Sequence, residues 1–119
     1  MGLFEKFKNK ETSNAPKTHN HGGCIVTKSL YEGTSKLKWI FRESSVNPAD
    51  NGWRAIGDTD TEEYINEPGN NVVVDFDRLV EIEPAVLAIY DMPIGTDLEF
   101  CHDDTGRYFI DSNTGKRVK

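Results

Sequence analysis

The sequence predicts a single α+β domain, with a mostly antiparallel sheet of four to six short strands and two short helices. Three observations predict this fold class. Short apolar runs alternate with clusters of turn-forming residues, which is typical of short strands joined by tight loops. Two further segments open with helix-capping residues or with proline. The length of 119 residues suffices for one sizeable core without a metal or disulfide.

Domain boundaries follow from where the large apolar residues begin and end. Residues 11–23 are polar, rich in turn formers and free of large apolar side chains, so we expect residues 1–21 to be a flexible N-terminal segment and linker. The single domain is predicted to span residues 22–112. Residues 113–119 are expected to be a frayed tail.

Three strands are predicted in the first part of the domain. Residues 24–27 are β-branched or apolar. Leu37, Trp39 and Phe41 alternate with Lys38, Ile40 and Arg42, which predicts a strand with one buried face and places Trp39 in the core. Residues 53–56 form a third extended piece after a loop that is dense in turn formers.

The later strands are predicted from a different pattern. Residues 72–74 are three consecutive valines, and such a continuous apolar run is typical of a strand buried on both faces, so we place it centrally. Residues 98–102 alternate in polarity. The turn at 104–106 joins them to residues 108–110 as a hairpin.

Two short helices are predicted between these strands. Asp58 or Thr59 can cap a helix that runs to Ile65, with Glu62 and Glu63 in its first turn, where the helix dipole favours negative charge.

Pro84 opens the second helix at residues 84–90, since proline is tolerated at a first helical position. Asp77 can cap a further turn before it. We place Val73 of the valine run and Leu87 of the second helix in the core.

Charge is concentrated in one segment. The formal net charge is −6, and residues 58–83 alone carry nine acidic residues against Arg78, a local charge of −8. Such a chain repels phosphate, so nucleic acid is not expected as a partner. Complementary charge raises encounter rates between proteins, and the acidic segment therefore favours a basic protein partner.

The cysteines and histidines do not form a recognisable catalytic or metal site. The spacing of His19, His21 and Cys24, with Cys101 and His102 as a second pair, does not match the usual zinc-ligand spacing. Neighbours in a strand point to opposite faces, so Cys101 and His102 are not expected to form an activated pair. We expect no metal, no cofactor and no enzymatic activity.

Cellular context follows from what the chain lacks. Neither a secretory apolar segment at the N-terminus nor an apolar run of membrane-spanning length occurs in the sequence. Two cysteines far apart in sequence do not make a disulfide framework. We expect a cytoplasmic protein without a membrane span.

Several short motifs carry a family resemblance. They are residues 24–28 at the start of the domain, residues 41–43, residues 51–54 (Asn-Gly-Trp-Arg), the acidic segment 58–64, and the Pro-x-Gly at 93–95. In order and spacing they resemble the immunity protein 33 family, earlier catalogued as a domain of unknown function, over about residues 23–100. The resemblance implies a bacterial protein whose relatives neutralise the toxins of polymorphic toxin systems, with no catalytic residues.

The candidate binding residues combine this expectation with the charge pattern. Tryptophan and arginine are the residue types that most often anchor interfaces, although the position of Trp53 at a strand start favours a core residue over an interface residue. The alternative function is a small cytosolic enzyme or ligand-binding domain that shares the fold. The predicted binding residues are Trp53, Arg54, Asp58, Asp60, Glu62 and Glu63, and the predicted partner is a basic cognate toxin.

Overall fold

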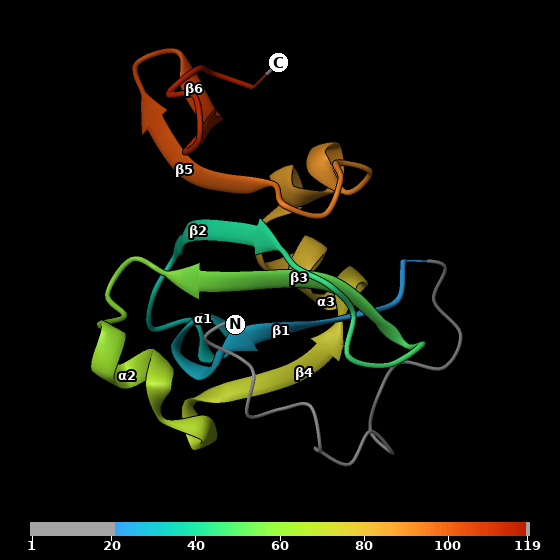
Figure 1. Ribbon diagram of the computed structural model, residues 1–119. Coiled ribbons are helices and arrows are strands. Elements are labelled where there is room, and N and C mark those ends of the chain that lie inside the picture. Colours follow the sequence, from blue (N-terminus) through green and yellow to red (C-terminus); the bar gives the residue numbers. More distant parts are fainter. Residues whose placement is uncertain (1–20, 119) are drawn as a thin grey trace.

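Six short strands form a mixed sheet in the computed structural model, which describes residues 21–118. The spatial order is β4-β1-β3-β2-β5-β6, from the bottom to the top of Figure 1. Four of the five strand pairings are antiparallel, and β1 with β3 is parallel. The predicted α+β class and mostly antiparallel sheet are thus confirmed. The strands are β1 (Gly23–Thr27), β2 (Leu37–Arg42), β3 (Asp50–Gly57), β4 (Asn71–Asp75), β5 (Asp97–Asp103) and β6 (Gly106–Asp111).

Short helices fill the connections between the strands. The predicted helix after Gly57 is α2, but its cap is Thr61, whose side chain accepts a hydrogen bond from the Tyr64 amide. The second predicted helix begins at Pro84 as expected, although it is a 3₁₀ helix. The helices are α1 (Lys28–Glu32), α2 (Glu62–Asn66), η2 (Pro68–Asn70), α3 (Phe76–Ile82) and η3 (Pro84–Ile89).

The two faces of the sheet are covered differently. On one face, α1, α3 and η3 pack on the strands around Leu30, Trp53 and Phe76, each 0% exposed. On the other face, Ile65 of α2 packs on Ile25 and Ile56 in a smaller cluster. In Figure 1, α3 therefore lies behind the sheet and α2 at its left end.

Trp39 is not a core residue, contrary to the sequence prediction, because its side chain is 39% exposed. The pairing of β2 with β3 is irregular between Leu37 and Trp39. An irregularity of this kind breaks strict alternation, so Leu37 and Ile40 face the main core. Trp39 consequently lies outside it, with the ammonium group of Lys38 5.7 Å from its ring centroid.

The valine run and Leu87 are also placed differently from the prediction. β4 is the outermost strand on its side of the sheet, not a central one, and its three valines are half-buried. In η3, residues three apart share a face, so Val86 and Ile89 point into the core. Leu87 is 49% exposed.

The C-terminal residues 113–118 pack back on the sheet instead of forming a frayed tail. Arg117 bridges Ile110 of β6, and the Val118 amide donates to the carbonyl of Phe109 at 2.8 Å. The Val118 side chain packs against the main core. This apolar contact and the backbone bonds hold the segment along the outer edge of β6.

Replacing Ile89 with alanine should lower the free energy of unfolding by about 2–5 kcal/mol, because Ile89 is 2% exposed in the core. Leu87→Ala, two residues away, should cost below about 0.5 kcal/mol, since surface changes cost little. Urea denaturation of both variants measures the difference. Equal losses of unfolding free energy for the two variants would contradict the assignment of Ile89 to the buried face of η3 and of Leu87 to its exposed face.

Candidate functional site

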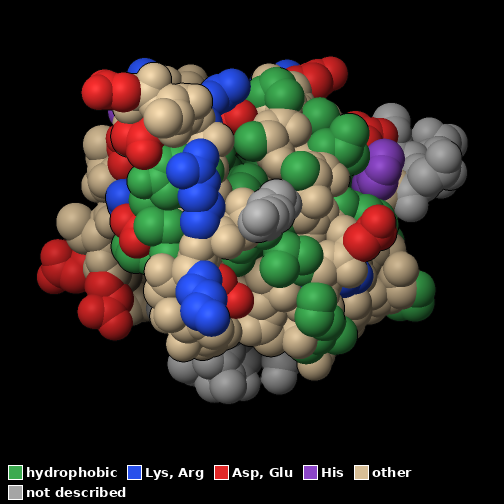
Figure 2. Space-filling model, turned by 90° about the horizontal axis from the view of Figure 1, so that it is seen from above, with side chains coloured by type: hydrophobic (Ala, Val, Ile, Leu, Met, Phe, Trp, Pro, Cys, Tyr) green, Lys and Arg blue, Asp and Glu red, His purple; other side chains and the backbone are tan. Residues whose placement is uncertain are grey.

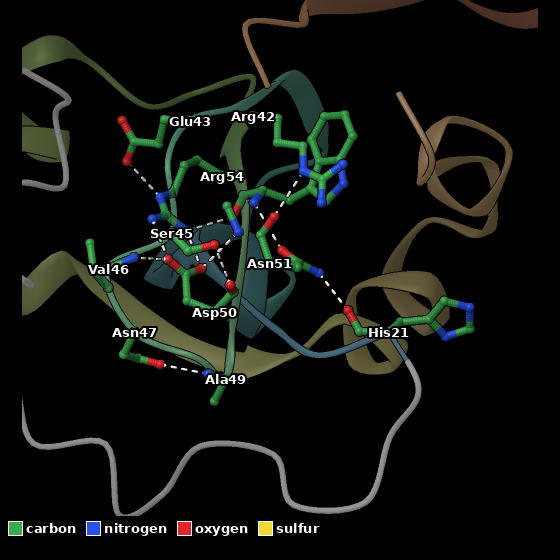
Figure 3. Close-up of polar contacts among 12 residues, drawn as sticks. His21, Arg42, Glu43, Ser45, Val46, Asn47, Ala49, Asp50, Asn51 and Arg54 are labelled. Carbon is green, nitrogen blue, oxygen red and sulfur yellow. Dashed lines mark hydrogen bonds and ion pairs between the residues drawn. The ribbon is translucent and has the colours of Figure 1, made fainter. Parts of the chain in front are cut away.

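Arg54 is a fully buried charged residue on β3. Its guanidinium donates to both carboxylate oxygens of Asp50, at 2.7 and 2.8 Å, and to Oε2 of Glu43 at 2.7 Å (Figure 3). A fourth bond goes to the carbonyl of Trp53 at 3.1 Å. A buried guanidinium is tolerated only when its donors are satisfied, and these partners supply that satisfaction.

The loop before β3 is organised around the same carboxylate. Asp50 also accepts from the amides of Val46 and Gly52, at 2.8 and 2.9 Å. Gly52 has a φ of 90°, and a Cβ there would lie 2.2 Å from the carbonyl oxygen of Glu43. Only glycine fits this close approach. Glycine at position 52, in the first part of β3, is therefore a structural requirement for bringing Asp50 and Glu43 onto Arg54.

Trp53 is a core residue, which settles the alternative left open by the sequence. Its side chain is 0% exposed, and its indole N–H donates to the carbonyl of Tyr90 at 3.1 Å. The guanidinium of Arg42 lies 5.6 Å from its ring centroid. Because neither Trp53 nor Arg54 has exposed surface in this structure, their role here is to position the loop and η3.

Asp60 also makes internal contacts. Its carboxylate accepts from Ser29 Oγ at 2.5 Å and from the Gly57 amide at 2.7 Å. Ser29 in turn contacts Ser35 Oγ at 2.8 Å. This cluster ties the start of α1 to the end of β3. Gly57 is required beside it, because a Cβ there would lie 1.8 Å from Ser35 Oγ.

The remaining acidic candidates lie on the surface. Asp58, Glu62 and Glu63 are exposed, as is Glu67 just after α2. Within residues 21–118, the carboxylates of Glu62, Glu63 and Glu67 make no hydrogen bond or ion pair. Figure 2 shows acidic side chains along its left rim, the side on which α2 lies in Figure 1. This part of the molecule therefore presents uncompensated negative charge.

The structure thus divides the six predicted binding residues into two groups. Trp53, Arg54 and Asp60 are internal, whereas the other three, Asp58, Glu62 and Glu63, share the exposed end at α2. The partners of Arg54, Asp50 and Glu43, were missed by the sequence analysis. Asp50 precedes Arg54 by four residues, but this spacing indicates a charge pair in a helix and not in a strand. No sequence signal identifies Asp50 or Glu43 as a partner of Arg54, because the loop between β2 and β3 places both.

A groove of about 1000 Å³ opens between α1, the end of α3 and strands β2 and β5. Tyr31 and Phe100 are among its apolar walls. Its arginines are already paired, Arg78 with Glu81 at 2.8 Å and Arg107 with Glu83 at 2.7 Å. The groove therefore shows no clear preference for a charged ligand.

The cysteines are not activated for nucleophilic chemistry. Burial raises the pKa of the Cys24 thiol far above its usual range. The pKa of the Cys101 thiol is also raised, first by desolvation and then by the negative charge of the nearby Glu99 carboxylate. A nucleophilic cysteine needs the opposite shift. Among residues 21–118, no three His, Cys, Asp or Glu side chains gather as a metal site, and His19 lies outside this range. None of the helices in residues 21–118 has the length and apolarity that crossing a bilayer requires.

Comparison with known proteins identifies the family. The model of the immunity protein Imm33 domain matches residues 24–110, which covers the six strands except for Gly23 and Asp111 at the two ends. The chain belongs to the Imm33 domain family. No curated protein and no solved structure matches it. The resemblance seen in the short sequence motifs is confirmed, and the Arg54 network and the α2 acids both lie inside the matched part of this Imm33 domain.

The stability of the Imm33 domain should depend on pH through Asp50. Burial alone would raise the pKa of Asp50, but the hydrogen bonds and charge of Arg54 outweigh it and hold that pKa below its usual value. A lowered folded-state pKa stabilises the fold above the unfolded pKa of about 3.9, and this stabilisation is lost as the pH falls through the folded pKa.

Asp50→Asn should therefore cost about 3–5 kcal/mol at neutral pH, because it breaks a buried pair. The difference from the parent should shrink as the pH falls from about 4, where Asp50 of the unfolded chain takes up a proton, through the lower folded-state pKa of Asp50. Urea denaturation across this pH range measures it. A difference that stays constant with pH would contradict the pairing of Asp50 with Arg54.

Asp60→Asn should destabilise the Imm33 domain by about 1–3 kcal/mol, because an amide donor would face Ser29 or the Gly57 N–H. Asp58→Asn is the matched control. Asp58 is exposed, and within residues 21–118 its carboxylate accepts only from the Lys36 amide. An asparagine side-chain oxygen can accept the same bond, so the change should stay below about 0.5 kcal/mol. Thermal melts compare the two. Equal melting temperatures would show that Asp60 has no internal role.

Proposed function

We propose that this protein binds a cognate toxin in the cytoplasm and neutralises it by stoichiometric contact, without catalysis. Membership of the Imm33 domain family carries this proposal. The family description names an immunity role, and such a role needs a binding surface, not a reaction centre.

Charge on the surface supports a basic partner. Glu62, Glu63 and Glu67 are exposed and have no partner within residues 21–118, so their fields extend into solvent. A toxin with a basic surface is attracted over several ångströms to such a region. Exposed carboxylates of this kind mainly accelerate the encounter, and apolar contacts formed afterwards retain the partner.

The buried charges support a preformed binding surface. Arg54 is held by three carboxylate bonds and Asp60 by two further bonds. These contacts fix the two ends of β3, from which α2 and the loop at residues 43–49 extend. A surface held in this way loses little conformational entropy on binding, which favours affinity.

The proposed function is tested by capture followed by rescue. The tagged protein is used to capture partners from its native cell, and each captured protein is expressed alone and together with this chain. One captured protein should arrest growth alone and permit growth when the chain is present. If every captured protein is harmless alone, or arrests growth equally with and without the chain, the immunity role is wrong.

Charge steering gives a kinetic prediction. The triple variant Glu62→Gln, Glu63→Gln and Glu67→Gln should lower the association rate of the growth-arresting protein about tenfold at low salt, and much less at high salt, because exposed charges are screened. Stopped-flow fluorescence measures these rates.

The matched control removes the same charge elsewhere. Asp91, Asp97 and Asp104 are exposed and lie outside α2, and their replacement by asparagine should leave the association rate nearly unchanged. If both triple variants slow association equally, only the net charge matters and α2 does not steer the partner.

A further inference from the structure

One outer edge of the sheet is covered by another segment of the chain, and within residues 21–118 the other edge is not paired with a strand. The outer edge of β6 is covered by the C-terminal residues, through the bridge of Ile110 with Arg117 and the Val118 amide bond to Phe109. The opposite edge is β4. Among residues 21–118, no strand pairs with the outer side of β4, which is the lowest strand of the sheet in Figure 1.

β4 lacks the features that normally prevent an edge strand from pairing. Proteins protect open edges with lysine, proline or a bulge. The sequence of β4 is Asn-Val-Val-Val-Asp, which contains neither lysine nor proline. All five of its residues pair with β1 in continuous antiparallel register, from Thr27 opposite Asn71 to Gly23 opposite Asp75. The strand is therefore regular and apolar, and alternate residues direct their N–H and C=O groups outward.

Negative charge lies at both ends of this edge. Before β4 stand Glu62, Glu63 and Glu67, whose carboxylates have no partner within residues 21–118. The side-chain amide of Asn71 donates to the carbonyl of Ile65 at 2.8 Å and holds α2 beside the strand. At the end of β4 and just after it come Asp75 and Asp77, and Oδ1 of Asp77 lies 2.9 Å from Nδ1 of His21. Residues 58–77 contain seven acidic residues and no lysine or arginine.

We propose that the outer edge of β4 is the docking site for an extended basic segment of the toxin, which adds to the sheet as a seventh strand. This inference rests on the proposed function and names the contact that serves it. Main-chain hydrogen bonds to β4 supply affinity, and the acidic residues at either end select a lysine- or arginine-rich segment.

Charge argues against a second copy of this chain as the occupant. In a symmetric antiparallel pairing of two β4 strands, the start of one strand lies beside the end of the other. The α2 carboxylates of one copy would then approach Asp75 and Asp77 of its partner, and like charges repel. A basic segment meets no such penalty at either end.

Two proline variants test the pairing. Of Val72 and Val73, one N–H points toward β1 and the other outward, because consecutive residues alternate. Proline at the outward position removes a donor without breaking the sheet, so that variant should melt like the parent. It should weaken binding of the growth-arresting protein by about tenfold or more, since it removes one hydrogen bond and obstructs its neighbours. Calorimetry measures the affinity.

Threonine at the same position is the conservative comparison. It keeps the N–H and a β-branched shape, so affinity should return to within about threefold of the parent. If the folded proline variant binds like the parent, β4 is not the docking edge. If proline and threonine weaken binding equally, side-chain contact and not strand addition holds the toxin, and the proposal is wrong.

Amide hydrogen exchange decides the case in which both proline variants unfold. In the parent, the outward amide of Val72 or Val73 should exchange at least about tenfold more slowly when the growth-arresting protein is bound. Unchanged exchange overturns strand addition even where growth is rescued, so the docking edge fails without the immunity role. Protection in the free protein that rises with its concentration assigns the edge to a second copy instead. Failure of the rescue itself removes both proposals.

Discussion

The buried charge of Arg54 is the constraint on which the surrounding structure depends. A guanidinium without exposed surface must be neutralised and its donors satisfied, and the chain does this with Asp50 and Glu43 on either side of one loop. That requirement fixes the path of residues 43–52 and needs glycine at position 52. It also sets where β3 begins, and the start of β3 fixes Trp53 under η3. The Arg54 network thus fixes the loop between β2 and β3 and the start of β3.

Much of the fold could be predicted from local sequence. Strand β1, the β5–β6 hairpin and the Pro84 helix all follow from patterns within about ten residues. The predictions were wrong where the burial of a residue depends on strands that are distant in the sequence. The irregular pairing near Lys38 moved Trp39 out of the core, and only the register with β3 shows it. The three valines suit an edge strand as well as a central one, because burial of β4 depends on which strands lie beside it.

The sequence predicts where negative charge is concentrated, but it does not predict which of the acidic side chains are exposed. Counting carboxylates finds the acidic segment at 58–83, yet it cannot separate Asp60, which accepts hydrogen bonds inside the fold, from Asp58, which is exposed. The difference depends on Ser29, thirty-one residues earlier in the chain. Arginine is a frequent interface residue and also a frequent partner of buried carboxylates, so the residue type of Arg54 alone does not distinguish these roles.

Strand order also bears on how the protein emerges from the ribosome. β1, β2, β3 and β4 are neighbours in the sheet and have all been synthesised once residue 75 is made. The β5–β6 hairpin attaches afterwards to β2, through residues 39–41. Domains made from the N-terminus can form early contacts before synthesis ends. The acidic α2 and the edge strand β4 are therefore made with the first four strands, while Leu98, Phe100 and Phe109 of the hairpin complete the core last.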